Sequence, residues 1–375
     1  DNTAVGKSAL YANTTGANNV AVGANALDAN TTGAQNTAVG KEALSACTTA
    51  NSNTAVGQLA ASALTTGYAC VAIGDQAMGA GVVTGNSNTA VGYQAGENLT
   101  SGDDNNFFGT YAGEQTTTGS YNVSMGYEAL EENTTGSSNV ALGHKALANS
   151  TTSYLTAVGG MALEANTTGS GNTGLGFRTL YTNTTGSSCV AVGYDALYTN
   201  NGNYNVAVGM NALYTNSTSS NNTAVGYLAL QLCTAGNNTG IGYKALQNTS
   251  TGADNTALGT GAAVTNTTGD KNTALGKDAL NQNSTADLNV AIGFQALYQN
   301  TGEKNVHVGS YAADQNTTGA YNVVIGYNAS QGNTTGSSNV CIGYKAGNTG
   351  NGDNQLYIAR SNGGGGSASQ WIVGN

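Results

Sequence analysis

A short phrase recurs along almost the whole of this chain. It first reads NTAVGKSALYANTTG, from Asn2 to Gly16, and returns as NVAVGANALDANTTG and then NTAVGKEALSACTTA. The glycine that closes NTAVG, called here the marker glycine, occurs 21 times between Gly6 and Gly343, at spacings of 16 to 18 residues and usually 17. Such a period is typical of solenoid proteins, in which one short repeat cannot bury its own apolar face and stacks on its neighbours.

Each repeat predicts one short β-strand that ends at the marker glycine. Thr or Val stands three residues before the glycine in every repeat except that of Asn106, and the residue directly before the glycine is always apolar. These two positions share one face of an extended chain, while the residue between them, mostly Ala, points to the other face. We expect this alanine row to pack closely against sister chains. The glycine predicts a bend that a Cβ would obstruct.

The second half of each repeat predicts the rest of a thin coil. Ala stands three residues after the marker glycine in every repeat but that of Thr179, and Leu usually follows, which predicts a second short strand or a bend. The polar stretch that comes next, often NTTG, predicts a surface turn. No room remains for a helix of about 11 residues.

These features predict an all-β fold, a parallel β-solenoid of about 21 coils of 16 to 18 residues. The repeats occupy residues 1–347, and residues 348–375 form a non-repeat extension. At about 4.8 Å per coil, the stacked coils would make a rod about 100 Å long.

Asparagine stands four residues before the marker glycine in 18 of the 21 repeats. Stacked in register, these side chains predict a ladder of amide–amide hydrogen bonds. Representative members of this predicted ladder are Asn2, Asn19, Asn36, Asn53, Asn122 and Asn139. The complete absence of proline fits the same stacking, because proline would remove a backbone donor between coils. The five cysteines also fall in repeat positions and form neither a disulfide framework nor a CxxC pattern.

Composition argues against several functional classes. Only 8% of residues are charged and the net charge of −10 contains no basic cluster, which disfavours nucleic-acid binding. No stretch approaches 18 consecutive apolar residues, so we expect no membrane insertion. We also expect no catalytic residue, no cofactor and no metal site. The isolated His144 has no nucleophile beside it, and His307, in an alanine position, is interpreted as an interface or core substitution.

Acidic residues recur five places after the marker glycine. Glu114 and Glu131 could form a carboxylate pair across neighbouring coils, as in a glycosidase, although solvated loop charge is the favoured interpretation. Asp103 and Asp104 could contribute to a Ca²⁺ site, but no calcium-binding repeat motif accompanies them.

Tyrosines in matching positions suggest a binding surface. Tyr181, Tyr198 and Tyr214 occupy the same position in three successive repeats. Exposed tyrosine rows suit glycan binding because the ring has an apolar face and a polar tip, whereas simple stacking between coils is the alternative.

The NTT turns satisfy the acceptor pattern for N-glycosylation. The matching residues are Asn13, Asn30, Asn133, Asn166, Asn183, Asn266, Asn316 and Asn333. These turns would carry glycans on an exported filament and would be bare turns in a virion protein made in bacterial cytosol. The sequence leaves both interpretations open.

The repeats NTAVG, NVAVG and NVAIG followed by xxAL resemble the head repeats of trimeric autotransporter adhesins and of related phage tail fibres. The resemblance covers about residues 2–347. It implies a left-handed parallel β-roll and three chains packed side by side. The repeats here are longer than the adhesin type, with the extra length in the NTTG loop. The segment NQLYIARSNGGGGSASQWIVGN resembles the strand-turn-strand that follows such repeats in phage fibres.

The leading functional hypothesis is therefore a non-catalytic extracellular fibre or adhesin shaft. It would lie on a virion or a cell surface, form a homotrimer and attach to a glycan or protein receptor. The alternative is a protomer of a self-assembling extracellular filament, because solenoid ends expose unpaired strand edges. An ice-binding solenoid is disfavoured because the NTTG loops vary in length, and a carbohydrate-active enzyme ranks last.

Overall fold

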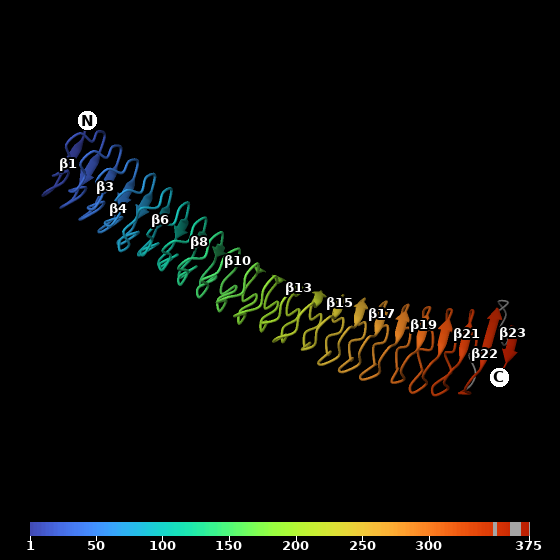
Figure 1. Cartoon of the computed structure of the whole chain (residues 1–375). Coiled ribbons are helices and arrows are strands. Elements are labelled where there is room, and N and C mark those ends of the chain that lie inside the picture. Colours follow the sequence, from blue (N-terminus) through green and yellow to red (C-terminus); the bar gives the residue numbers. More distant parts are fainter. Residues whose placement is uncertain (348–350, 361–368, 375) are drawn as a thin grey trace. The chain divides into compact units, whose positions relative to one another are not determined.

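The computed structural model describes residues 1–347, 351–360 and 369–374. The chain divides into two compact units, unit 1 over Asp1–Cys189 and unit 2 over Val190–Asn375. Within each unit the chain winds through a series of stacked coils, each with one short strand on the same side (Figure 1). The described residues contain strands, turns and bends but no helix.

Unit 1 contains eleven strands of three residues. They are β1 (Thr3–Val5), β2 (Val20–Val22), β3 (Thr37–Val39), β4 (Thr54–Val56), β5 (Val71–Ile73), β6 (Thr89–Val91), β7 (Asn106–Phe108), β8 (Val123–Met125), β9 (Val140–Leu142), β10 (Thr156–Val158) and β11 (Thr173–Leu175). Each strand is the TAV-like segment predicted from the repeat.

Unit 2 contains ten more strands of this kind and two longer ones. They are β12 (Val190–Val192), β13 (Val206–Val208), β14 (Thr223–Val225), β15 (Thr239–Ile241), β16 (Thr256–Leu258), β17 (Thr273–Leu275), β18 (Val290–Ile292), β19 (Val306–Val308), β20 (Val323–Ile325), β21 (Val340–Ile342), β22 (Leu356–Arg360) and β23 (Ser369–Gly374). The ten short strands and the eleven of unit 1 account for the 21 repeats.

Neighbouring strands pair in parallel and in exact repeat register. Val20 of β2 pairs with Thr37 of β3, Ala21 with Ala38, and Val22 with Val39. The same register recurs in unit 2, where Ala207 of β13 pairs with Ala224 of β14. The predicted all-β parallel solenoid of about 21 coils is therefore confirmed. The left-handed winding of the coils, which the resemblance implies, stays a prediction.

The C-terminal segment changes the pairing pattern. Strand β22 continues the parallel stack beside β21, with Val340 opposite Leu356. Strand β23 then pairs antiparallel with β22, with Leu356 opposite Gly374. Of the predicted extension over 348–375, residues 348–350, 361–368 and 375 lie outside the described residues.

The middle residue of the short strands from β2 to β21, usually alanine, points into its own coil. Ala21, Ala38 and Ala55 have no exposed surface, whereas the first and third residues of these strands are partly exposed. The expectation that the alanine row packs against sister chains is therefore wrong. Because side chains alternate along a strand, the Thr/Val and Val/Ile/Leu rows form the outward face instead. We call the middle position the alanine slot and the outward rows the sheet face.

The opposite wall of each coil is a bend rather than a second strand. Ala26 and Leu27, three and four residues after marker Gly23, are fully buried against the alanine slots. Leu27 has a φ of 49° and lies in the left-handed region, as do Asn25 and Gln35 of the same coil. The pattern repeats in nearly every coil, and among the described residues no Val, Ile or Thr has a positive φ. This exclusion is expected because β-branched side chains fit left-handed backbone worst.

The marker glycine is required by both conformation and space. Gly309 has a φ of 134°, and a Cβ at this position would lie 2.5 Å from the carbonyl oxygen of Gly326 in the next coil. The predicted bend that a Cβ would obstruct is thereby confirmed. The close approach allows the backbone of each coil to stack directly on the next.

Where one wall of the core carries a larger side chain than usual, the opposite wall carries smaller ones. Strand β7 carries Phe107 in the alanine slot, and glycines replace the usual leucine at Gly96 and Gly113. A Cβ on Gly96 would lie 2.7 Å from the Phe107 ring, and one on Gly113 would lie 2.5 Å from it. The ring therefore occupies the space that two leucines fill in other coils.

We predict that Phe107→Ala destabilises unit 1 by about 3–5 kcal/mol, because it empties a well-packed site. The triple variant Phe107→Ala/Gly96→Leu/Gly113→Leu restores the common alanine–leucine arrangement and should return to within about 1.5 kcal/mol of the parent. Urea unfolding followed by circular dichroism measures both. A triple variant no more stable than the single one would contradict this packing.

Candidate functional site

The predicted asparagine ladder runs along the inside edge of the strands. The backbone N–H of Asn36 donates to Oδ1 of Asn19 at 3.0 Å, and Nδ2 of Asn36 donates to the carbonyl oxygen of Ala50 at 2.8 Å. Asn2, Asn53, Asn122 and Asn139 accept hydrogen bonds from the next coil in the same way. The predicted amide–amide bond occurs as well, for example from Asn122 to Asn105 at 3.0 Å. The ladder therefore ties side chain to backbone more often than amide to amide.

The asparagines of the NTT turns form a second interior column. They stand seven residues after the marker glycine, and we call this row the turn column. Nδ2 of Asn183 donates to the carbonyl oxygen of Gly186 at 3.0 Å and to Oδ1 of Asn166 at 2.9 Å. Asn30, Asn133, Asn166, Asn183, Asn266, Asn316 and Asn333 are all buried, and Asn13 is partly buried.

This geometry argues against glycan attachment at the turn column. Nδ2 is the atom that would carry the glycan, and in every one of these eight residues it donates to the glycine carbonyl three residues later. A glycan at this atom would require the coil to open. The exposed part of each turn is the threonine pair that follows the asparagine.

All five cysteines are buried, and none forms a disulfide. Cys47 and Cys233 belong to the turn column, and burial raises the pKa of each thiol to about 11. At neutral pH both thiols are protonated and poorly reactive. They interrupt the column, because a thiol does not supply the donors and acceptor of an asparagine amide.

Two buried polar atoms of the turn column beside Cys233 have no partner. Oδ1 of Asn216 in the preceding coil and Oγ1 of Thr249 in the following coil make no hydrogen bond with any described residue. An asparagine between them could donate to Asn216 and accept from Thr249. The column would then be continuous over these three coils.

We predict that Cys233→Asn stabilises unit 2 by about 1–2 kcal/mol, since an unpaired buried polar group costs about 1–3 kcal/mol. Cys233→Ala is the matched control, because it removes the thiol without adding an amide, and it should not stabilise. Urea midpoints at neutral pH distinguish the two variants. An asparagine variant less stable than the alanine variant would contradict this description of the column.

The tyrosine rows are stacked between coils. In unit 2 the rings of Tyr198 and Tyr214 lie 5.0 Å apart at an interplanar angle of 13°. Tyr181 belongs to unit 1 and is partly buried. The stacking between coils considered as the alternative from sequence is thus present for Tyr198 and Tyr214, and it occupies one ring face of each. Glycan binding at these tyrosines stays a prediction.

Longer aromatic rows stand just after the marker glycines. In unit 1 the rings of Tyr93, Tyr111, Tyr127 and His144 follow one another at 5.5, 6.0 and 5.6 Å between centroids. In unit 2 Phe294, Tyr311, Tyr327 and Tyr344 do so at 5.2, 6.1 and 5.7 Å. These rows border the sheet face.

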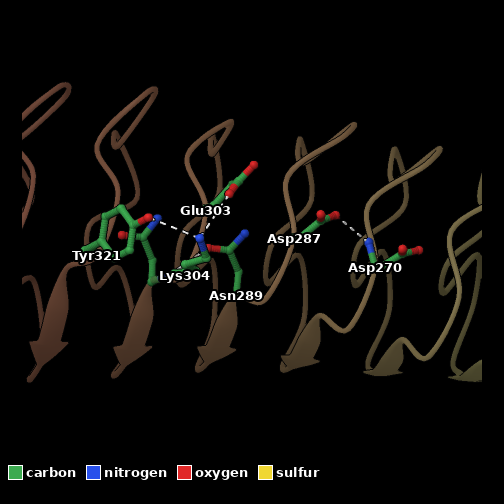
Figure 2. A network of polar contacts seen from close by, with 7 residues as sticks. Asp270, Asp287, Asn289, Glu303, Lys304 and Tyr321 are labelled. Atoms are coloured by element: carbon green, nitrogen blue, oxygen red, sulfur yellow. Dashed lines mark hydrogen bonds and ion pairs between the residues drawn. The ribbon is translucent and has the colours of Figure 1, made fainter.

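Some carboxylates of the turns accept hydrogen bonds from the backbone of a neighbouring coil. In unit 2 the backbone N–H of Asp270 donates to Oδ1 of Asp287 at 2.8 Å, and that of Ala253 donates to Oδ1 of Asp270 at 2.7 Å. Figure 2 shows Asp270, Asp287 and Glu303 on successive coils, with the ammonium of Lys304 between Glu303 and the hydroxyl of Tyr321. In unit 1 Asp103 accepts from the backbone of Asn86 at 2.7 Å.

Glu114 and Glu131 have perturbed acidities. Burial raises the pKa of Glu114 above its usual range, and the charge of Glu97 adds to the shift. Burial likewise raises the pKa of Glu131, with Glu128 and Glu114 contributing. These side chains are only partly buried; Glu114 contributes to the shift of the Glu131 pKa, whereas the Glu114 pKa responds to Glu97, Glu132 and Glu128 rather than to Glu131. Among the described residues no group of three His, Cys, Asp or Glu side chains could hold a metal ion.

The sheet face of each unit is a continuous uncharged surface. From β1 to β21 its two rows contain Thr, Val, Ile, Leu, Met, Phe and one Asn, but no Asp, Glu, Lys or Arg. More than a third of the residue surface is exposed at Val56, Ile73, Met125 and Leu175 in unit 1 and at Leu258, Leu275, Ile325 and Ile342 in unit 2. Contiguous exposed apolar side chains of this kind mark interaction sites in soluble proteins, so this face is the candidate interaction site.

Neither protein-family models nor curated proteins match the chain. The likeness to adhesin heads and phage fibres therefore depends on the repeat motif alone. Among the residues that the structure describes, no helix could span a membrane.

Proposed function

We propose that this chain is the shaft of a non-catalytic extracellular fibre, on a virion or a cell surface, that self-associates side by side and carries attachment to a glycan or protein receptor. The observation that supports the proposal is the sheet face. It is uncharged along each unit and partly exposed in a single chain. Covering it against water would contribute about 25 cal/mol for each Å² of apolar surface.

The partner that fits this surface is another copy of the chain. The face repeats once per coil, so only a partner with the same repeat can cover all of it in register. Three copies with their sheet faces turned to a common axis would bury the Val/Ile/Leu rows and leave the polar turns in water. Such a trimer agrees with the arrangement that the resemblance to adhesin heads implies.

The proposal assigns neither catalysis nor nucleic-acid binding nor membrane insertion to the chain. For catalysis, its support is that turn carboxylates such as Asp270 and Asp287 accept hydrogen bonds from backbone N–H groups of adjacent coils. The second candidate, a filament protomer that stacks end to end, differs in having no fixed number of chains.

The expected mass of the native particle is that of three chains. We predict that Leu258→Lys/Leu275→Lys reduces it to one chain, because two charges would be buried against the partner without counter-charges. Thr268→Lys/Thr285→Lys places the same charges on exposed turn residues and should leave the trimer intact. Native mass spectrometry reads the mass, and circular dichroism checks that each variant is folded.

Other outcomes would overturn parts of this proposal. A parent particle with the mass of one chain would refute self-association. A sheet-face variant that remains trimeric would place the interface elsewhere. An open-ended series of masses in the parent would favour the filament.

A further inference from the structure

His307 lies in the core of unit 2. It occupies the alanine slot of β19, between Ala291 of β18 and Val324 of β20, and none of its surface is exposed. The opposite wall leaves space for the imidazole, because the small Ala313 replaces the leucine found at this position in most coils. This is the same exchange of volume that accommodates Phe107 in unit 1.

The imidazole has no polar partner in this position. Neither Nδ1 nor Nε2 makes a hydrogen bond with any described residue. Ser124, which occupies the alanine slot of β8, instead donates to the carbonyl oxygen of Ala129 at 2.6 Å. A buried polar group without a partner is costly, and a buried charge without one is far more costly. The folded coil therefore holds His307 only in its neutral form.

No nearby charge can compensate a proton on this ring. The residues of β18 and β20 are not titratable, and the opposite wall presents Ala312 and Ala313. Asp314, the next residue, is half-buried, and its pKa is raised by its own burial. Burial is the sole cause that lowers the pKa of His307, to about 3.

We propose that the coil containing β19 is an acid-labile point of unit 2, which opens in mildly acidic medium before the coils around it. When the coil opens, the exposed imidazole has an ordinary pKa near 6.5 and becomes protonated in mild acid. The buried imidazole of the folded coil stays neutral. Between that value and about 3 the open state binds more protons, so folding weakens as the pH falls. Opening becomes about tenfold more favourable for each pH unit in this window.

The carboxylates with raised pKa act in the opposite direction. Glu114 and Glu131 of unit 1 bind protons more readily folded than unfolded, so mild acid stabilises their coils. The pKa of Asp314, in the His307 coil, is also raised. Its protonation therefore favours the folded coil too, at pH values near that pKa. Between pH 7.5 and pH 5 we therefore expect the loss of stability in the His307 coil and not in the coils of Glu114 and Glu131.

The weakening stays local because a solenoid coil contacts only its neighbours. Opening of this coil would expose the edges of β18 and β20. The response arises within a single chain and does not require assembly. Mild acid would therefore open unit 2 at this one coil.

Hydrogen–deuterium exchange at pH 7.5 and pH 5, corrected for intrinsic exchange rates, tests the proposal. Peptides covering β18 to β20 should lose about 30-fold in protection, the ratio expected for a group of pKa 6.5 across this range. Peptides covering β13 to β15, whose alanine slots hold Ala or Gly, are the internal control and should change little.

Two variants separate the histidine from other acid effects. His307→Ala/Ala313→Leu restores the alanine–leucine arrangement of the preceding coil, where Ala291 and Leu297 are buried, and should abolish the loss at pH 5. His144→Ala removes the other histidine, which stacks on Tyr127 in unit 1, and should leave the loss unchanged. Protection at β19 that is independent of pH, a loss shared equally by β13 to β15, or a loss that persists in the double variant would each overturn the proposal.

Discussion

Direct stacking of one coil on the next, in register, is the interaction on which the rest of this structure depends. Parallel pairing aligns each strand with its counterpart one repeat later, and the marker glycines let the backbones approach closely enough for it. The register then determines which side chains contact one another, because equivalent residues of successive coils form continuous rows. Polar rows satisfy one another by hydrogen bonds between coils, and apolar rows form a thin core. A proline anywhere in these strands would remove a bond between coils.

Much of this architecture could be predicted from sequence, because period and alternation are local signals. The strands, the bend at the marker glycine and the position of the ladder asparagines were all readable from the repeat. The inward direction of Ala21 and its equivalents was not, since alternation separates two faces without saying which is buried.

The turn column was missed for a different reason. Asn-Thr-Thr-Gly is ordinary surface-turn chemistry, and only the three-dimensional coil shows that Asn183 points inward. The presence of Cys47 and Cys233 in the same row, with Leu64 and Leu99, was the available signal of burial. The left-handed leucines were equally hidden, although the absence of Val, Ile and Thr from these positions marks them in retrospect. The proposed self-association depends on the outward rows, so the direction of each side chain decides which surface is available to a partner.

Deletion of one complete coil tests the central role of register most directly. Removing residues 123–139 joins Asn122 to Val140 and preserves every row, so the shortened chain should fold with a thermal midpoint within a few degrees of the parent. Removing Ser124 alone shifts β8 by one residue and exchanges its inward and outward side chains, which should unfold the coils around it. Circular dichroism melting of both deletions gives the answer. A coil deletion that unfolds the chain, or a single-residue deletion that is tolerated, would contradict this account.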